Sequence, residues 1–211
     1  MMADMGNYII GGIIAIFVLV GGLYLVRSRG NEIQASPSGV PVTQQVATST
    51  YASTTLGVSA VYPNNYHVDE SYAYDQFGPK KLIHGVKFHI PEAMATGTNL
   101  SMSDTGISIE QLPHAKKCTA DIYLTENVRA PALTENGVQY TFASSTDAGA
   151  GNLYEEDVYA LTGSQPCTAI RYFIHSGNIG NYGTSTNVRE FDTNALLKDF
   201  DAIRASVVLT H

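Results

Sequence analysis

Apolar residues follow two periods along most of the chain. Short segments alternate apolar and polar side chains, a pattern typical of strands, and the clearest are residues 56–62, 82–90, 107–112, 138–142, 153–161 and 167–175. In residues 193–206 the apolar side chains recur at helical spacing instead, and Asp192 or Thr193 can cap the first turn. Residues 119–124 fit a second, shorter helix.

The order of these elements predicts the fold class. Strands come first and a helix closes the chain, with turn signals such as Asn136-Gly137 and the five-residue loop 162–166 between strands. This order predicts an α+β fold, in which an antiparallel β-sheet has flanking helices.

A different pattern occupies the start of the chain. A run of 19 residues without a charge begins at Tyr8 and ends at Val26, long enough as a helix to cross a bilayer core of ~30 Å. A cleaved signal peptide would begin with basic residues and end in a small-residue cleavage site, whereas here Asp4 precedes the run and Arg27 follows it. We therefore expect residues 1–30 to form a retained transmembrane helix that anchors the chain in a membrane.

The remaining residues divide into two parts. Residues 31–55 are rich in Ser, Thr, Gln and Pro, which predicts a flexible spacer. Residues 56–211 have the length of one ordinary globular domain. The formal net charge of −7 argues against a nucleic-acid partner, and two cysteines are too few for a disulfide-dense mini-protein.

Four segments of the domain carry packing motifs of a known family. Residues 61–67 (VYPNNYH), 85–91 (GVKFHIP) and 106–110 (GISIE) look like strands, and residues 200–209 (FDAIRASVVL) look like a closing helix and a final strand. Through these motifs, residues 56–209 resemble the PsbP-like family, which contains the photosystem II extrinsic subunit P and bacterial extracytoplasmic relatives. The resemblance implies an α/β/α sandwich and a role in binding or assembly.

Motifs for catalysis and cofactor binding are missing from the sequence. It contains no G-x-S-x-G elbow, no phosphate-binding glycine loop, no H-E-x-x-H and no C-x-x-C. His84 and His89 are five positions apart on one predicted strand, so they face opposite sides of a sheet and cannot share a metal. We expect no catalytic, cofactor-binding or metal-binding residues, and no cofactor.

One polar constellation is a speculative site. In the hairpin around residues 162–166, Glu155 and Asp157 share one strand face, and Arg171 and His175 share a face of the returning strand. If positions 157 and 171 pair, Asp157 meets Arg171 and Glu155 lies diagonal to it. Such a group could bind a ligand or transfer protons, but we favour a solvent-facing surface of ordinary ion pairs.

Cys118 and Cys167 are expected to form a disulfide, which would place the domain outside the cytoplasm. The alternative is two buried free thiols in a cytosolic domain, and Arg27 and Arg29 after the apolar run favour that topology. The Ser- and Thr-rich spacer, the low lysine content and the resemblance favour the extracytoplasmic side.

These observations lead to one functional hypothesis and two alternatives. The hypothesis is a single-pass membrane protein whose extracytoplasmic domain acts as a binding or assembly module for an unknown protein partner, without catalysis. The first alternative is a pilin-like subunit of a surface filament, which shares the apolar N-terminal helix and a β-rich head. The second is a membrane-anchored hydrolase.

Overall fold

The computed structural model describes residues 46–183 and 186–210, which belong to one compact unit. The expected transmembrane anchor, residues 1–30, lies outside the described residues. Within the two described ranges, no helix combines the length and the apolar character that a membrane span requires.

The described residues form β-strands, two α-helices and two short 3₁₀ helices. In chain order they are β1 (Thr48–Ser53), β2 (Val58–Pro63), β3 (His67–Asp69), β4 (Ala73–Tyr74), β5 (Ile83–His89), α1 (Glu92–Ala95), β6 (Gly106–Leu112), η1 (Ala120–Tyr123), β7 (Ala132–Glu135), β8 (Val138–Gly149), β9 (Asn152–Leu161), β10 (Cys167–Gly177), η2 (Ile179–Asn181), α2 (Thr193–Ala205) and β11 (Val208–Leu209). The predicted segments with alternating side chains all contribute strands, so the α+β class with antiparallel sheets is confirmed.

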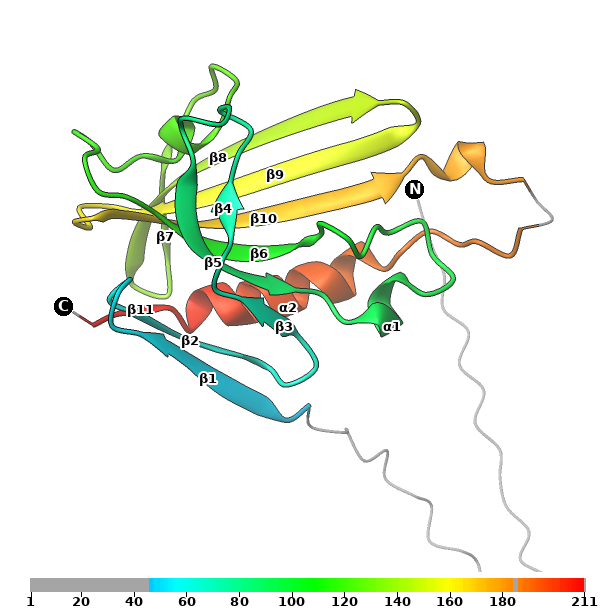
Figure 1. Ribbon diagram of the computed structural model, residues 1–211, viewed down its shortest axis with the longest axis horizontal. Helices are drawn as coiled ribbons and strands as arrows, with labels where there is room; N and C mark the ends of the chain where they lie inside the picture. The colour runs from blue at the N-terminus through cyan, green and yellow to red at the C-terminus, as the bar shows by residue number, and fades with distance from the viewer. Residues whose placement is uncertain (1–45, 184–185, 211) are drawn as a thin grey trace, which may run out of the picture. The chain divides into compact units, whose positions relative to one another are not determined.

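An eight-stranded sheet forms the larger part of the fold. Its order is β3-β5-β6-β10-β9-β8-β7, with β4 paired to β5, and Figure 1 shows β8, β9 and β10 as long neighbouring strands. The turn Asn136-Gly137 connects β7 to β8 with φ values of 50° and 82°, as the sequence predicted. Ala150 and Gly151 connect β8 to β9 with φ values of 52° and 85°. Positive φ at both central residues matches the twist of the flanking strands, which makes both hairpins tight.

Helix α2 covers one face of this sheet, and its predicted apolar face is confirmed. The Asp192 carboxylate caps the helix by accepting a hydrogen bond from the Ala195 N–H at 3.0 Å. Leu196, Phe200 and Ile203 are buried against the sheet. The main hydrophobic core lies here, and the sheet contributes Val86, Phe88, Ile107, Ile109, Ile170, Tyr172 and Ile174 to it.

A three-stranded sheet in the order β1-β2-β11 packs on the other side of α2 (Figure 1). Strand β1 corrects the expected spacer, because Thr48–Ser53 lies inside residues 31–55 yet pairs with β2 along its whole length. Tyr51 is 8% exposed and joins the main core. The sequence concealed this strand because Thr and Ser fill most of its positions, so only one large apolar side chain marks the buried face.

The opposite face of the large sheet has no α-helix packed on it in the described part of the chain. Residues 113–131 and the segment around β4 cover it instead, and buried Tyr74, Ile83 and Tyr123 form a second apolar cluster there. The expected α/β/α sandwich is therefore wrong in this layer. Residues 119–124 make only the 3₁₀ turn η1, because Thr119 provides no side-chain cap and Leu124 already has extended backbone.

Substituting Phe200 tests the packing of α2. Its side chain has no exposed surface, so Phe200→Ala removes buried apolar area and leaves a cavity. We expect a loss of roughly 3–5 kcal/mol in the free energy of unfolding, measured by urea denaturation. The matched control is Asn194→Ala on an exposed position of the same helix, with a change under about 0.5 kcal/mol. Equal midpoints for both variants would contradict the packing described here.

Candidate functional site

Arg171 is the centre of a buried ionic cluster on the sheet face opposite to α2. Its strand neighbours Ile170 and Tyr172 belong to the main core, and side chains alternate along a strand, so Arg171 points to the other face. The Arg171 side chain has no exposed surface. Its guanidinium binds Glu110 with two hydrogen bonds, from Nε to Oε1 and from Nη2 to Oε2, both 2.9 Å long.

A second carboxylate and an aromatic ring complete the surroundings of the guanidinium. Nη1 donates to the Glu156 carboxylate, and Nη2 also donates to the Tyr123 carbonyl at 2.8 Å. The ring centroid of Tyr74 lies 3.5 Å from the guanidinium carbon, a cation–π contact. Burial alone lowers the pKa of Arg171, but the Glu110 and Glu156 carboxylates outweigh it and raise that pKa. The guanidinium is therefore charged.

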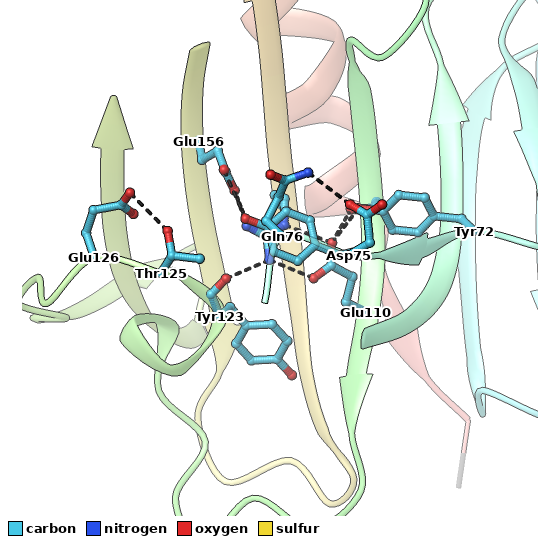
Figure 2. Close-up of polar contacts among 11 residues, drawn as sticks. Tyr72, Asp75, Gln76, Glu110, Tyr123, Thr125, Glu126 and Glu156 are labelled. Carbon is cyan, nitrogen blue, oxygen red and sulfur yellow. Dashed lines mark hydrogen bonds and ion pairs between the residues drawn. The ribbon is translucent and has the colours of Figure 1, made fainter. Parts of the chain in front are cut away.

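Hydroxyl groups satisfy further lone pairs of the two carboxylates. Tyr72 and Ser108 donate to Oε1 of Glu110, at 3.0 and 2.7 Å. Tyr74 donates to the Glu156 carboxylate at 3.0 Å. Burial raises the pKa of both tyrosines, so each remains a neutral donor. Figure 2 shows the resulting network of dashed contacts between Glu110, Glu156 and the residues around them.

The expected pairing in this hairpin is wrong by one residue. Arg171 pairs across the ladder with Val158, and Asp157 pairs with Tyr172. The shift turns Glu155 and Asp157 to the α2 face and brings Glu156 to Arg171 instead. The speculative polar face therefore does not exist as one surface: it splits between the two faces of the sheet.

The hairpin loop causes this shift. The ladder ends at the pair Ala160 and Ala169, which makes the loop asymmetric. Inside the loop, the backbone N–H of Thr168 donates to the Ser164 hydroxyl at 2.9 Å rather than across the ladder. A sequence argument that counts only residues 162–166 misses the extra residue on the β10 side.

Glu155 and Asp157 lie on the α2 face, and among the described residues no guanidinium forms an ion pair with either. Burial raises the pKa of Glu155, and the charge of Asp157 adds to that rise. Burial also raises the pKa of Asp157, with a smaller contribution from the carboxylate of Asp201 on α2 and an opposing hydrogen bond from Ser144. These two carboxylates line neither the cavity nor the Arg171 cluster and form no part of the site.

His175 lies four positions beyond Arg171, on the same face of β10. Its Nδ1 is 2.7 Å from one carboxylate oxygen of Asp104 and 2.9 Å from the other, and its ring stacks on Tyr154 with 4.4 Å between centroids. The hydroxyl of Ser101 donates to Asp104, not to His175. In the described ranges Nε2 has no hydrogen-bond partner, so this carboxylate-oriented imidazole has no hydroxyl or thiol nucleophile beside it.

An open cavity of about 370 Å³ borders the Arg171 cluster. Four carboxylates and three aromatic rings line it, together with small polar groups: Asp104, Glu126, Asp147 and Glu156; Tyr74, Tyr154 and Phe173; Gln76, Thr125 and Ser145. Figure 2 shows Gln76, Thr125, Glu126 and Glu156 around this region. Tyr74 and Glu156 belong to both the cavity and the cluster, so the buried ionic network fixes part of the cavity wall.

The cavity has the chemistry of a site for an organic cation. Carboxylates attract positive charge, and aromatic faces add cation–π attraction. Burial raises the pKa of Glu156, while Arg171 opposes that rise. Lys87 lies behind the cavity, with its Nζ 5.3 Å from the Phe173 ring centroid. No group of three or more potential ligands in the described residues is arranged to hold a metal ion.

The predicted disulfide between Cys118 and Cys167 is confirmed. It joins residues 49 positions apart, with 5.0 Å between the Cα atoms. The Tyr123 hydroxyl donates a hydrogen bond of 2.7 Å to the backbone carbonyl of Cys167, one of the two disulfide cysteines. The bond therefore holds the segment after β6 onto the start of β10, close to the layer that covers Arg171.

Sequence reasoning missed Glu110, Glu156, Tyr72 and Tyr74. One signal was available for Glu110: it lies in a short strand whose other side chains on that face are Ser108 and Leu112, so a buried charge needed a partner. The identity of that partner was not readable, because Glu110 and Arg171 are 61 positions apart. Tyr72 and Tyr74 could not be predicted as part of the cluster, since nothing in the sequence places the segment around β4 over β10.

The buried ion pair generates a test by double substitution. Arg171→Met removes the guanidinium that binds both Glu110 and Glu156, so we expect roughly 3–5 kcal/mol of destabilisation in urea unfolding. Arg171→Met combined with Glu110→Met removes one buried charge of each sign, and we expect this double variant to be more stable than Arg171→Met alone. Additive losses from the two substitutions would contradict a coupled pair.

Comparison with known proteins gives a likeness in fold only. No protein-family model matches the chain, and no curated protein matches it. The solution structure of cyanobacterial PsbP (CyanoP) from Synechocystis sp. PCC 6803 is similar at 15% identity and a TM-score of 0.40, covering 85% of this chain and 99% of that one. A crystal structure from Bacteroides thetaiotaomicron VPI-5482 is similar at 12% identity and a TM-score of 0.40, covering 77% of this chain. This chain spans about half (48%) of that protein. The resemblance expected from the sequence is thus present as a weak fold-level resemblance to PsbP.

Proposed function

We propose that the chain is a membrane-tethered binding or assembly module, not an enzyme, whose domain lies outside the cytoplasm. Its binding site is the cavity beside the Arg171 cluster, and its ligand is a cationic group of a protein partner, the side chain of Lys or Arg. The observation that supports this proposal most is the meeting of four carboxylates and three aromatic rings in one cavity.

The size and the preorganisation of the cavity fit such a ligand. Its volume of about 370 Å³ is near the lower end for ligand pockets, which suits one side chain rather than a large cofactor. Glu156 is held by Arg171 and Tyr74, so it is already oriented before a ligand arrives. Asp147 and Glu126 also line the cavity and are exposed, so both can contact an incoming cation.

The sequence and the disulfide support the two other parts of the proposal, the membrane tether and the extracytoplasmic position of the domain. The apolar run from Tyr8 to Val26 has the length of a single membrane span. The bond between Cys118 and Cys167 is of a kind that persists in oxidising compartments. These points support an extracytoplasmic domain against the opposite preference of Arg27.

Titration with a small cation tests the cavity. The probe is N-acetyl-arginine amide, added to the full chain in detergent micelles and followed by NMR. We expect saturable shifts at Ser145, Tyr154 and Phe173, and a several-fold weaker affinity in the double variant Glu126→Gln, Asp147→Asn, because two exposed charges are lost without disturbing the Arg171 cluster.

The matched control for this titration is Glu190→Gln, an exposed carboxylate away from the cavity, which should leave the affinity unchanged. N-acetyl-glutamine amide should cause no saturable shifts. Equal binding of both amides, or equal loss in the control variant, would rule out a cation site at this cavity.

Thiol labelling of protein from its native membrane tests the compartment. Free thiols are alkylated before lysis, and the protein is then analysed by mass spectrometry without reduction. We expect Cys118 and Cys167 to remain unlabelled and linked, because an oxidising compartment keeps the disulfide. Alkylation of both cysteines would place the domain in the cytoplasm.

A further inference from the structure

A second hollow lies on the same side of the molecule as the Arg171 cluster, and its lining differs from that of the cavity. It is a shallow groove of about 700 Å³ formed by the end of β6, the loop that follows it and η1. Leu112, Pro113, Ala115 and Ile122 make its floor mostly apolar. Asp121 is the one carboxylate among its lining residues.

Two lysines are among the residues that line this groove. Lys116 and Lys117 line it and are exposed, and in the described ranges no carboxylate lies within 4.0 Å of either ammonium nitrogen. His114 is exposed beside them. The groove therefore combines an apolar floor with two lysines that form no ion pair within the described part of the chain.

A second lysine pair belongs to the same end of the sheet. Lys80 and Lys81 are exposed on the loop between β4 and β5, next to Leu82, which is 41% exposed. Phe77 of this loop and Ile122 of the groove segment both pack against the same apolar cluster. Asp75 is the only carboxylate on that loop. Both loops thus present lysines and apolar side chains from one packed layer.

The positive groove and the acidic cavity lie toward opposite ends of β9 and β10. Leu112 pairs with Cys167, at the end of the ladder near the loop 162–166. Tyr154, in the cavity wall, pairs with His175 near the other end. The two hollows therefore differ in charge, and a negatively charged surface would be attracted to the lysines and repelled by the carboxylates.

We propose that the groove and the two lysine loops, residues 77–82 and 113–122, dock on the anionic headgroups of a lipid bilayer. Lysines pair with headgroup phosphates while the apolar floor and Leu82 contact the acyl boundary. The inference rests on the proposed tether in one respect: an anchored chain keeps the domain beside a bilayer, so weak contacts suffice. The disulfide at Cys118 holds the loop in shape for docking.

Lysine footprinting in vesicles tests the docking. The full chain is reconstituted into phosphatidylcholine vesicles with or without phosphatidylglycerol, treated with an amine-reactive reagent and analysed by mass spectrometry. We expect labelling of Lys116 and Lys117 to slow by about five-fold when phosphatidylglycerol is present, and to recover at high salt. Lys198, exposed on α2, serves as the internal reference and should not change.

Variants separate the docking surface from general effects of charge. Lys116→Gln with Lys117→Gln should abolish the lipid-dependent protection of Lys80 and Lys81, whereas Lys198→Gln should leave it intact. Labelling rates that are equal in the two kinds of vesicle would overturn the proposal and leave an acidic protein as the partner of this surface.

Vesicle flotation, carried out at low and at high salt, distinguishes this inference from the proposed tether. A chain that floats with both kinds of vesicle but shows no lipid-dependent protection retains the tether and refutes docking. A chain that floats only with phosphatidylglycerol, and only at low salt, supports docking and refutes the tether.

Discussion

The buried guanidinium of Arg171 constrains the whole second face of the large sheet. An ion without access to water must meet opposite charge and hydrogen-bond acceptors nearby, and here Glu110 and Glu156 supply both from the strands on either side of β10. The Tyr74 ring and the Tyr123 carbonyl complete this environment from the covering segments. The covering layer is therefore held by polar contacts as well as by apolar packing.

Local order and the disulfide were predictable from the sequence, whereas the other contacts between distant segments were not. The closing helix, its Asp192 cap and the Asn136-Gly137 turn follow from spacing and turn chemistry, which act over a few residues. Strand β1 escaped prediction because its only strong apolar signal is Tyr51. The Arg171 cluster was not predicted because its members come from five separate segments, and alternation assigns a side chain to a face without identifying its neighbour.

The two faces of the large sheet have different chemistry, and β9 is where this is clearest. Three acidic residues follow one another there, and alternation sends Glu156 to Arg171 and the other two toward α2. On the α2 side, Arg204 lies over the Tyr159 ring at 4.1 Å and donates to Tyr172, so it attaches the helix to the sheet. Each face thus has one buried arginine that connects elements distant in sequence.

The pairing of β9 with β10 has a consequence for how the chain avoids misfolding. A slip by one residue in this hairpin would rotate every side chain of β10 to the opposite face. Arg171 would then enter the apolar core among Phe200 and its neighbours, while Ile170 would meet Glu110. Both errors would leave a charged side chain buried among apolar groups without a partner, which costs free energy. The buried arginine therefore disfavours the wrong register of this hairpin relative to the native one.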